Sequence, residues 1–166
     1  TRLALQETHS PFILLADTQA LSDHQGDYRT VRQAVIDVAL DYLAIGIDPQ
    51  KSTVLIQSMV PELAELSFYL MNLVSVARLE RNPTVKSELR AKGYAGQDRN
   101  VAAGFLSYPV SQAADITALR GTLIPVGEDQ LPMIEQTNEI VRRFNRMVGD
   151  NILSECQALL SSTTRL

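Results

Sequence analysis

The chain has 166 residues, enough for one domain that buries most of its apolar surface in a single core. It is 45% hydrophobic and 20% charged, as ordinary globular domains are, and its net charge of −4 argues against a domain devoted to binding the nucleic-acid backbone. No apolar run reaches the roughly 18 residues of a membrane span, and the single cysteine, Cys156, excludes a disulfide within the chain and fits a reducing compartment.

The first third of the chain predicts two short strands that alternate with helices. Residues 1–7 have the character of a helix end, and an opening without methionine favours a piece cut from a longer protein. Residues 12–16 (FILLA) and 53–57 (TVLIQ) are short apolar runs, which favour strands buried on both faces of a parallel sheet. Between them, residues 28–45 have the amphipathic pattern of a helix that an aspartate caps and a glycine ends.

The middle of the chain predicts a long helix and then a loop. The helix begins at the Val60-Pro61 pair and continues to Ala77, with more apolar surface than one face of a sheet needs. A subunit contact and a two-sided core helix both explain that surface. Residues 78–100 are rich in Arg and Lys with few large apolar side chains, which predicts a solvated, mobile loop. It is either a plain surface loop or one from which Lys86 or a neighbour reaches a phosphate.

The last third returns to alternating elements. A helix from residue 101 leads to a turn at Arg120-Gly121, a strand at 122–126 and a helix at 133–147, with a weakly patterned tail at 151–166. Because strands alternate with helices throughout, we expect an α/β fold with a Rossmann-like parallel sheet and flanking helices. The chain has too few histidines and cysteines for a zinc site, and it lacks a nucleophile elbow and a Gly-rich phosphate loop.

A row of polar side chains interrupts the apolar helix that precedes the third strand. Tyr108, Gln112 and Asp115 are spaced i, i+4 and i+7, so they lie on one face of a helix. The row is either bonded to neighbouring backbone or a set of hydrogen-bonding groups that face an apolar cavity. Ala113 and Ala114 beside it leave room for a ligand or for close helix packing.

A second polar group, Gly127-Glu128-Asp129-Gln130, follows the third strand at its carboxyl end, where open α/β sheets bind ligands. The two acids can accept hydrogen bonds from ribose hydroxyls or an ammonium group, and Gly127 admits a flat ligand close to the backbone. The alternative is an acidic start of the next helix, which the helix dipole favours.

Several segments together carry a family resemblance over about Gln6 to Arg146. VGEDQ preceded by YPVSQAAD, together with FILLADTQAL, LERNPTVKSE and IEQTNEIVRRFN, resembles the catalytic domain of bacterial tryptophanyl-tRNA synthetases, which are class I aminoacyl-tRNA synthetases. Tyrosyl-tRNA synthetases share the fold and are the nearest alternative.

The resemblance implies roles for the matching residues. Asp115 corresponds to the aspartate that accepts a hydrogen bond from the indole N–H of tryptophan, and Tyr108 and Gln130 to residues that hold the α-ammonium and carboxylate. The remaining positions are Ile124 and Val126 against the indole, Gly127, Glu128 and Asp129 along the adenosine of ATP, Lys86 near the triphosphate, Gln112 where many members have Met, and Gln19 where some have His.

The resemblance also implies what lies outside this sequence. Neither a HIGH-like nor a KMSKS-like ATP motif occurs here, so the catalytic residues remain unknown and we expect an incomplete fragment. Residues 1–166 are expected to form part of a nucleotide-binding catalytic domain, with a connective insertion at about 60–105 and no anticodon-binding domain. The implied partners are L-tryptophan, ATP with Mg²⁺, and tRNA(Trp), in a cytoplasmic homodimer without a membrane contact. The alternatives are a non-catalytic amino-acid-binding paralogue, a tyrosyl-tRNA synthetase-like enzyme and a structural dimerisation module.

Overall fold

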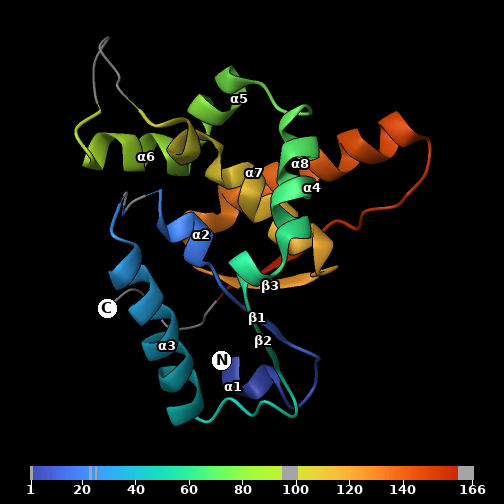
Figure 1. The fold of residues 1–166 in the computed structure, drawn as a ribbon. Coiled ribbons are helices and arrows are strands. Elements are labelled where there is room, and N and C mark those ends of the chain that lie inside the picture. Colours follow the sequence, from blue (N-terminus) through green and yellow to red (C-terminus); the bar gives the residue numbers. More distant parts are fainter. Residues whose placement is uncertain (1, 23, 25, 95–100, 161–166) are drawn as a thin grey trace. The chain divides into compact units, whose positions relative to one another are not determined.

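The computed structural model describes residues 2–22, 24, 26–94 and 101–160 (Figure 1). The chain divides into two compact units, Thr1–Pro61 (unit 1) and Glu62–Leu166 (unit 2), and each unit is described by itself. None of the helices in the described ranges is both long enough and apolar enough to cross a membrane.

Unit 1 contains one pair of parallel strands with helices before, between and after them. Its elements are α1 (Arg2–Leu5), β1 (Phe12–Leu15), α2 (Asp17–Ala20), α3 (Tyr28–Ala44), β2 (Thr53–Ile56) and the short 3₁₀ helix η1 (Gln57–Met59). β1 and β2 pair in register from Phe12 opposite Thr53 to Leu15 opposite Ile56, so both predicted strands are confirmed. The expected burial on both faces is wrong, since Phe12 is 52% exposed and Leu15 alone of β1 is buried.

The helix predicted between the two strands is confirmed as α3. The Asp27 carboxylate accepts a hydrogen bond from the Thr30 amide at 3.2 Å, which is the expected N-cap. Gly46 follows the helix with a φ of +96°, a left-handed conformation that favours glycine. Val31 is buried, whereas Val38 and Leu43 on the same helix are exposed.

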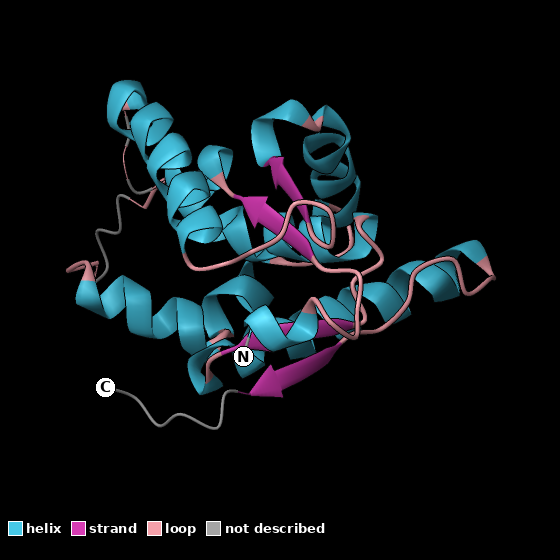
Figure 2. Cartoon of the chain, turned by 90° about the horizontal axis from the view of Figure 1, so that it is seen from below, coloured by secondary structure: helices cyan, strands magenta, loops and turns pink. Residues whose placement is uncertain are grey.

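Unit 2 contains five α-helices, one short 3₁₀ helix and a second parallel strand pair among its described residues. Figure 2 shows the helices in cyan and the strands of both pairs in magenta. The elements are α4 (Pro61–Met71, whose first residue closes unit 1), α5 (Val76–Arg81), α6 (Pro83–Ala91), α7 (Ala103–Ala118), β3 (Leu123–Val126), η2 (Glu128–Gln130), α8 (Leu131–Val148) and β4 (Gln157–Leu160). The helices predicted from residue 101 and at 133–147, and the third strand, are confirmed as α7, α8 and β3.

The prediction of one helix to Ala77 followed by a loop is wrong. α4 ends at Met71, and new helices begin at Val76 and Pro83. The residues before them, Ser75 and Asn82, are N-caps whose side chains accept hydrogen bonds from the amides of Arg78 and Thr84. α5 and α6 bury apolar side chains, namely Leu79, Val85 and Leu89. Arg81, Lys86 and Arg90 are exposed on these helices, whereas Arg78 is half-buried, and the caps rather than the charge decide the local structure. Residues 95–100 of the predicted loop lie outside the described residues.

The tail at 151–166 contains a strand that the sequence does not predict. β4 pairs in parallel with β3, from Gln157 opposite Leu123 to Leu160 opposite Val126. Asn138 and Asn145 of α8 each exchange two hydrogen bonds with the backbone of the returning segment, at Cys156 and at Leu153 respectively. Residues 161–166 lie outside the described part.

Two apolar clusters form the core of unit 2. The first joins α4, α5, α7 and α8 and consists of Leu70, Leu73, Leu79, Val110, Ala113, Ala114 and Ile140. The second joins α6, α7 and α8 and consists of Val85, Leu89, Phe105 and Met133. α7 contributes to both clusters. This packing holds α7 in place and with it the side chains that do not belong to either cluster.

Candidate functional site

The polar row Tyr108, Gln112 and Asp115 lies on α7, which is one continuous helix despite Pro109 within it. The three side chains therefore share a face, as their spacing predicts. Asp115 is only 7% exposed, while Tyr108 and Gln112 are half-buried. The Tyr108 hydroxyl donates a hydrogen bond to Glu88 Oε2 of α6 at 2.8 Å. The row thus combines a buried carboxylate with a phenol whose orientation α6 sets.

The two alanines beside the row serve helix packing. Ala113 and Ala114 are fully buried and belong to the first core cluster, which joins α7 to residues of α5 and α8. Of the two alternatives that the sequence leaves open, the structure shows the close approach of helices.

A tight turn connects α7 to β3. Arg120 adopts a φ of +52°, and the Gly121 amide donates to the Ile116 carbonyl at 2.9 Å. A Cβ at Gly121 would lie 3.0 Å from Ile124 Cδ1 and 3.4 Å from the Ile116 carbonyl oxygen, so glycine allows a close approach here. Ile124 and Val126 follow on one side of β3, and both are half-buried.

The acidic segment after β3 forms η2, directly before α8. Gly127 has a φ of −77°, which any residue adopts, but a Cβ there would lie 2.6 Å from Asp129 Oδ1. The space beside Gly127 therefore holds the Asp129 carboxylate, which folds back over it and accepts a hydrogen bond from Gln130 Nε2 at 3.1 Å. Glu128 and Asp129 are exposed and Gln130 is half-buried, so polar groups gather at this strand end as predicted. Their position before α8 also agrees with the helix-dipole alternative.

The other two predicted site residues, Lys86 and Gln19, belong to α6 and α2. Lys86 is exposed on α6, on a helix rather than in the expected loop. Gln19 belongs to α2 of unit 1, where its amide donates to Gln57 Oε1 at 3.0 Å. The neighbouring Asp17 accepts hydrogen bonds from the Ser58 amide and hydroxyl, which connects the carboxyl ends of β1 and β2.

Four further residues, not singled out in the sequence, form hydrogen bonds to the acidic segment or the polar row, or next to them. The Thr84 hydroxyl donates to the Asp129 carbonyl at 2.7 Å, and Glu88 accepts from Tyr108. Asn82 Nδ2 donates to Gln136 Oε1 at 2.9 Å, and both side chains are fully buried. The Asn-Pro pair at 82–83 is a helix-start signal and was the clue available in the sequence.

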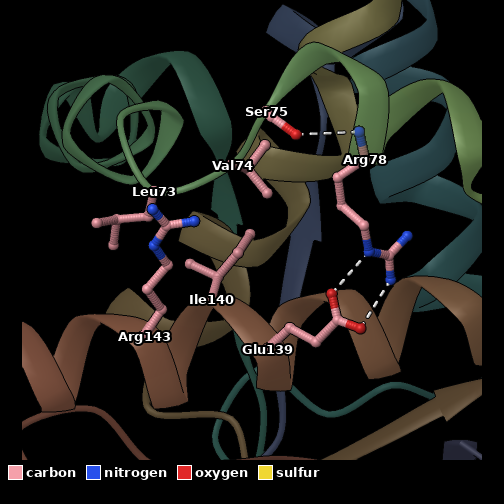
Figure 3. A pocket seen from close by; sticks show the side chains of 7 residues that line it. All are labelled: Leu73, Val74, Ser75, Arg78, Glu139, Ile140 and Arg143. Carbon is pink, nitrogen blue, oxygen red and sulfur yellow. Dashed lines mark hydrogen bonds and ion pairs between the residues drawn. The ribbon is translucent and has the colours of Figure 1, made fainter.

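A separate pocket of about 270 Å³ in unit 2 lies between α8 and the segment that connects α4 to α5, together with the start of α5 (Figure 3). Its lining consists of Leu73, Val74, Ser75, Arg78, Glu139, Ile140 and Arg143. The Arg78 guanidinium binds Glu139 through two hydrogen bonds of 2.8 and 2.9 Å, which raises the pKa of Arg78 above its ordinary value. None of the residues predicted for the site lines this pocket.

Acidic and metal-binding side chains do not gather into a metal centre in the described ranges. No group of three or more His, Cys, Asp or Glu residues there is arranged to hold an ion. Glu128 and Asp129 remain as a pair of exposed carboxylates.

Comparison with known proteins gives a consistent result. Residues 1–164 match the family model described as class I tRNA synthetases (W and Y). The chain is 58% identical over 154 residues to the tryptophan–tRNA ligase of Lactococcus lactis, covering 93% of this chain and 44% of that protein. It is 53% identical to the tryptophan–tRNA ligase of Clostridium longisporum, covering 98% of this chain and 48% of the relative.

A solved structure agrees with this match. The tryptophanyl-tRNA synthetase of Campylobacter jejuni, complexed with ADP and tryptophan, superposes with a TM-score of 0.88 at 30% identity. The similarity covers 99% of this chain and 49% of that protein. The chain therefore spans about half the length of the relatives it matches, and its parallel strands and helices are those of an incomplete Rossmann-like domain.

Proposed function

The chain belongs to the class I tRNA synthetases of tryptophan and tyrosine, and from this premise we propose that it is the central part of an ATP-dependent tryptophan–tRNA ligase. The complete protein would activate tryptophan to tryptophanyl-adenylate and transfer it to tRNA(Trp). The names of the relatives at 53% and 58% identity support tryptophan over tyrosine.

The observation that carries the proposal is the burial of Asp115 on an apolar helix. A carboxylate in such an environment favours a ligand that presents an N–H donor to it, because a charge-assisted hydrogen bond is stronger where water is excluded. The indole N–H of tryptophan supplies such a donor, whereas phenylalanine has none and the phenol of tyrosine places its donor elsewhere. Ile124 and Val126 would supply apolar contacts to the ring, and Gln112 lies on the same face of α7 as Asp115. The assignment of Gln19 to tryptophan binding rests on the family resemblance alone.

The amino-acid head group is assigned to Tyr108 and Gln130. The Tyr108 hydroxyl directs its proton to Glu88, so its oxygen presents lone pairs that suit the α-ammonium. The Gln130 amide can donate to the carboxylate of the substrate, and its present bond to Asp129 fixes its orientation.

The nucleotide side of the site is assigned to Gly127, Glu128 and Asp129, with Lys86 near the triphosphate. Carboxylates at a strand end suit ribose hydroxyls, and the carboxylate held over Gly127 shapes the approach of the nucleoside. Mg²⁺ would enter with ATP as part of the substrate, held largely by the phosphate oxygens. Activation requires in-line attack of the tryptophan carboxylate on the α-phosphate, and donors that stabilise this transition state would come from motifs outside this chain.

We assign residues 1–166 to the nucleotide-binding catalytic domain, with a connective insertion at about 60–105 and the anticodon-binding part outside the sequence. The coverage of less than half of each curated relative supports this assignment. The complete enzyme would be a cytoplasmic homodimer that binds tRNA(Trp). The exposed apolar face of α4 supports the dimer.

Tryptophan-dependent exchange of pyrophosphate into ATP by the complete gene product tests the proposal. Exchange driven by tryptophan and not by tyrosine is the expected result. Exchange driven by tyrosine instead would assign a tyrosyl-tRNA synthetase-like enzyme. Tryptophan binding without any exchange would favour a non-catalytic paralogue.

A further inference from the structure

Helix α6 contacts both halves of the proposed site through two polar side chains that the family resemblance leaves without a role. Thr84 and Glu88 are four residues apart, so they lie one turn apart on the same face of α6. Val85 and Leu89, the next residue after each, are buried in the second core cluster and anchor the helix. The polar face of α6 is therefore held at a fixed distance from the core.

Thr84 acts on the nucleotide half. Its hydroxyl donates to the backbone carbonyl of Asp129 at 2.7 Å, and the side chain is 8% exposed. The Thr84 amide is held by Asn82 Oδ1 at 3.0 Å. Asn82 Nδ2 in turn donates to Gln136 Oε1 and to the Pro132 carbonyl, both in α8. The start of α6 is thereby attached to the backbone on both sides of Gln130.

Gln136 takes part in this attachment through its side-chain carbonyl oxygen. Its side chain is fully buried, and its Nε2 has no hydrogen-bond partner among the described residues. An unsatisfied buried amide group is destabilising. The Gln136 carbonyl oxygen accepts the hydrogen bond from Asn82 Nδ2, and this buried bond holds the start of α6 against α8.

Glu88 acts on the amino-acid half. Its carboxylate accepts the hydrogen bond of the Tyr108 hydroxyl at 2.8 Å. The Tyr108 ring also packs edge-on against Phe105, with 5.8 Å between ring centroids. Ring and hydroxyl are both fixed, and the negative charge of Glu88 lies behind the oxygen that would meet an ammonium group.

We propose that Thr84 and Glu88 are positioning residues that set the nucleotide half and the amino-acid half of the site from one rigid helix. This inference rests on the proposed function, and neither residue is assigned a contact with substrate. Because the two bonds lead to different halves, their loss is expected to affect different substrates.

The test measures KM for ATP and for tryptophan by pyrophosphate exchange in the complete gene product. Thr84→Val keeps the shape but removes the hydroxyl, and is expected to raise KM for ATP roughly three- to tenfold, the equivalent of one hydrogen bond. Glu88→Ala is expected to raise KM for tryptophan by a similar factor, roughly three- to tenfold. In each variant the KM for the other substrate stays within about twofold, since its half of the site keeps its support.

Conservative variants separate positioning from general damage. Thr84→Ser keeps a hydroxyl and Glu88→Gln keeps an acceptor for the phenol, so both are expected to restore most of the wild-type KM. If Thr84→Val or Glu88→Ala does not fold, Thr84→Ala or Glu88→Asp replaces it with the same expected split. Failure of these to fold as well would make the residues structural and reject the proposal.

The outcomes also distinguish the inference from the proposed function. A wild-type protein without tryptophan-dependent exchange overturns the function, and the inference falls with it. An active wild type whose variants change both KM values equally, or neither, overturns the inference alone.

Discussion

Asp115 is the residue whose environment most restricts the substrate of the proposed site. Its carboxylate is buried on a helix whose other neighbours pack in an apolar core, so a ligand donor is worth more there than in water. The spacing of the row on α7 was predictable because a helical period fixes which side chains share a face. The hydrogen bond from Tyr108 to Glu88 could not be predicted in this way, because it joins two different helices and no local sequence period relates their faces.

Asp115→Ala is therefore expected to weaken tryptophan binding more than ATP binding in the complete protein. Loss of one buried, charge-assisted hydrogen bond corresponds to about 1.5–3 kcal/mol, or roughly 10- to 150-fold in Kd. Calorimetric titration with each substrate measures both affinities. An equal loss for tryptophan and ATP would instead make Asp115 a structural residue.

Cys156 provides a second prediction for a single residue. Burial raises the pKa of its thiol above the ordinary value of 9.0, since the thiolate loses hydration. The folded state then binds the thiol proton more tightly than the unfolded state does. The associated stability is fully present below the ordinary pKa and is lost as the pH rises through the folded pKa.

The stability difference between the wild type and Cys156→Ala is thus expected to shrink between about pH 7 and about pH 10. Urea unfolding of both proteins at the two pH values measures it, and the variant corrects for other groups that titrate in this range. A difference that is independent of pH would contradict the raised pKa.

At the scale of elements, the sequence predicts those whose signals are local and misses those that depend on distant contacts. α3 begins at the Asp27 cap, α8 has a proline in its first turn, and a glycine follows the end of each helix, so their bounds follow closely from the sequence. β4 has only a short apolar run, and its conformation depends on pairing with β3 and on the asparagines of α8. α5 and α6 lie where the sequence predicts a loop. Their many basic residues suggest a solvated loop, whereas the caps at Ser75 and Asn82 are the signals of helix starts.

The asparagine contacts predict how β4 depends on α8. The Asn138 amide donates to the Cys156 carbonyl and accepts from the Cys156 amide, both at 2.9 Å, in the manner of a neighbouring backbone. Asn138→Ala would leave these two backbone groups without their partner, at a cost of about 1–3 kcal/mol. Amide hydrogen exchange in β4 is expected to accelerate accordingly, while Asn151→Ala, at an exposed position next to the same segment, leaves it unchanged. Equal protection of β4 in both variants would assign its stability to β3 alone.

At the scale of the whole molecule, apolar surface remains exposed after both units have formed. Each unit has its own parallel strand pair, and parallel sheets are ordinarily covered on both faces. α4 has one buried and one exposed apolar face: Leu63 and Leu70 are buried, whereas Phe68 and Tyr69 are 69% and 59% exposed. The sequence left a two-sided core helix and a subunit contact open. The exposure of Phe68 and Tyr69 in the described part of the chain supports the subunit contact that we propose.

A charged substitution on this face tests the proposed homodimer. Phe68→Glu places a carboxylate where a stable interface would have to bury it, and an unpaired buried charge costs several kcal/mol. We expect the complete wild-type protein to sediment as a dimer and the variant to sediment as a monomer at the same concentration. Leu40→Glu is the matched control, because Leu40 is a helical apolar residue of comparable exposure, 58%, on α3 of the other unit. A wild type that sediments as a monomer would reject the homodimer, and dissociation by both variants would show that the effect is not specific to α4. Dissociation by Phe68→Glu alone would assign the subunit contact to the exposed face of α4, a helix of unit 2, which also contains Tyr108 and Asp115.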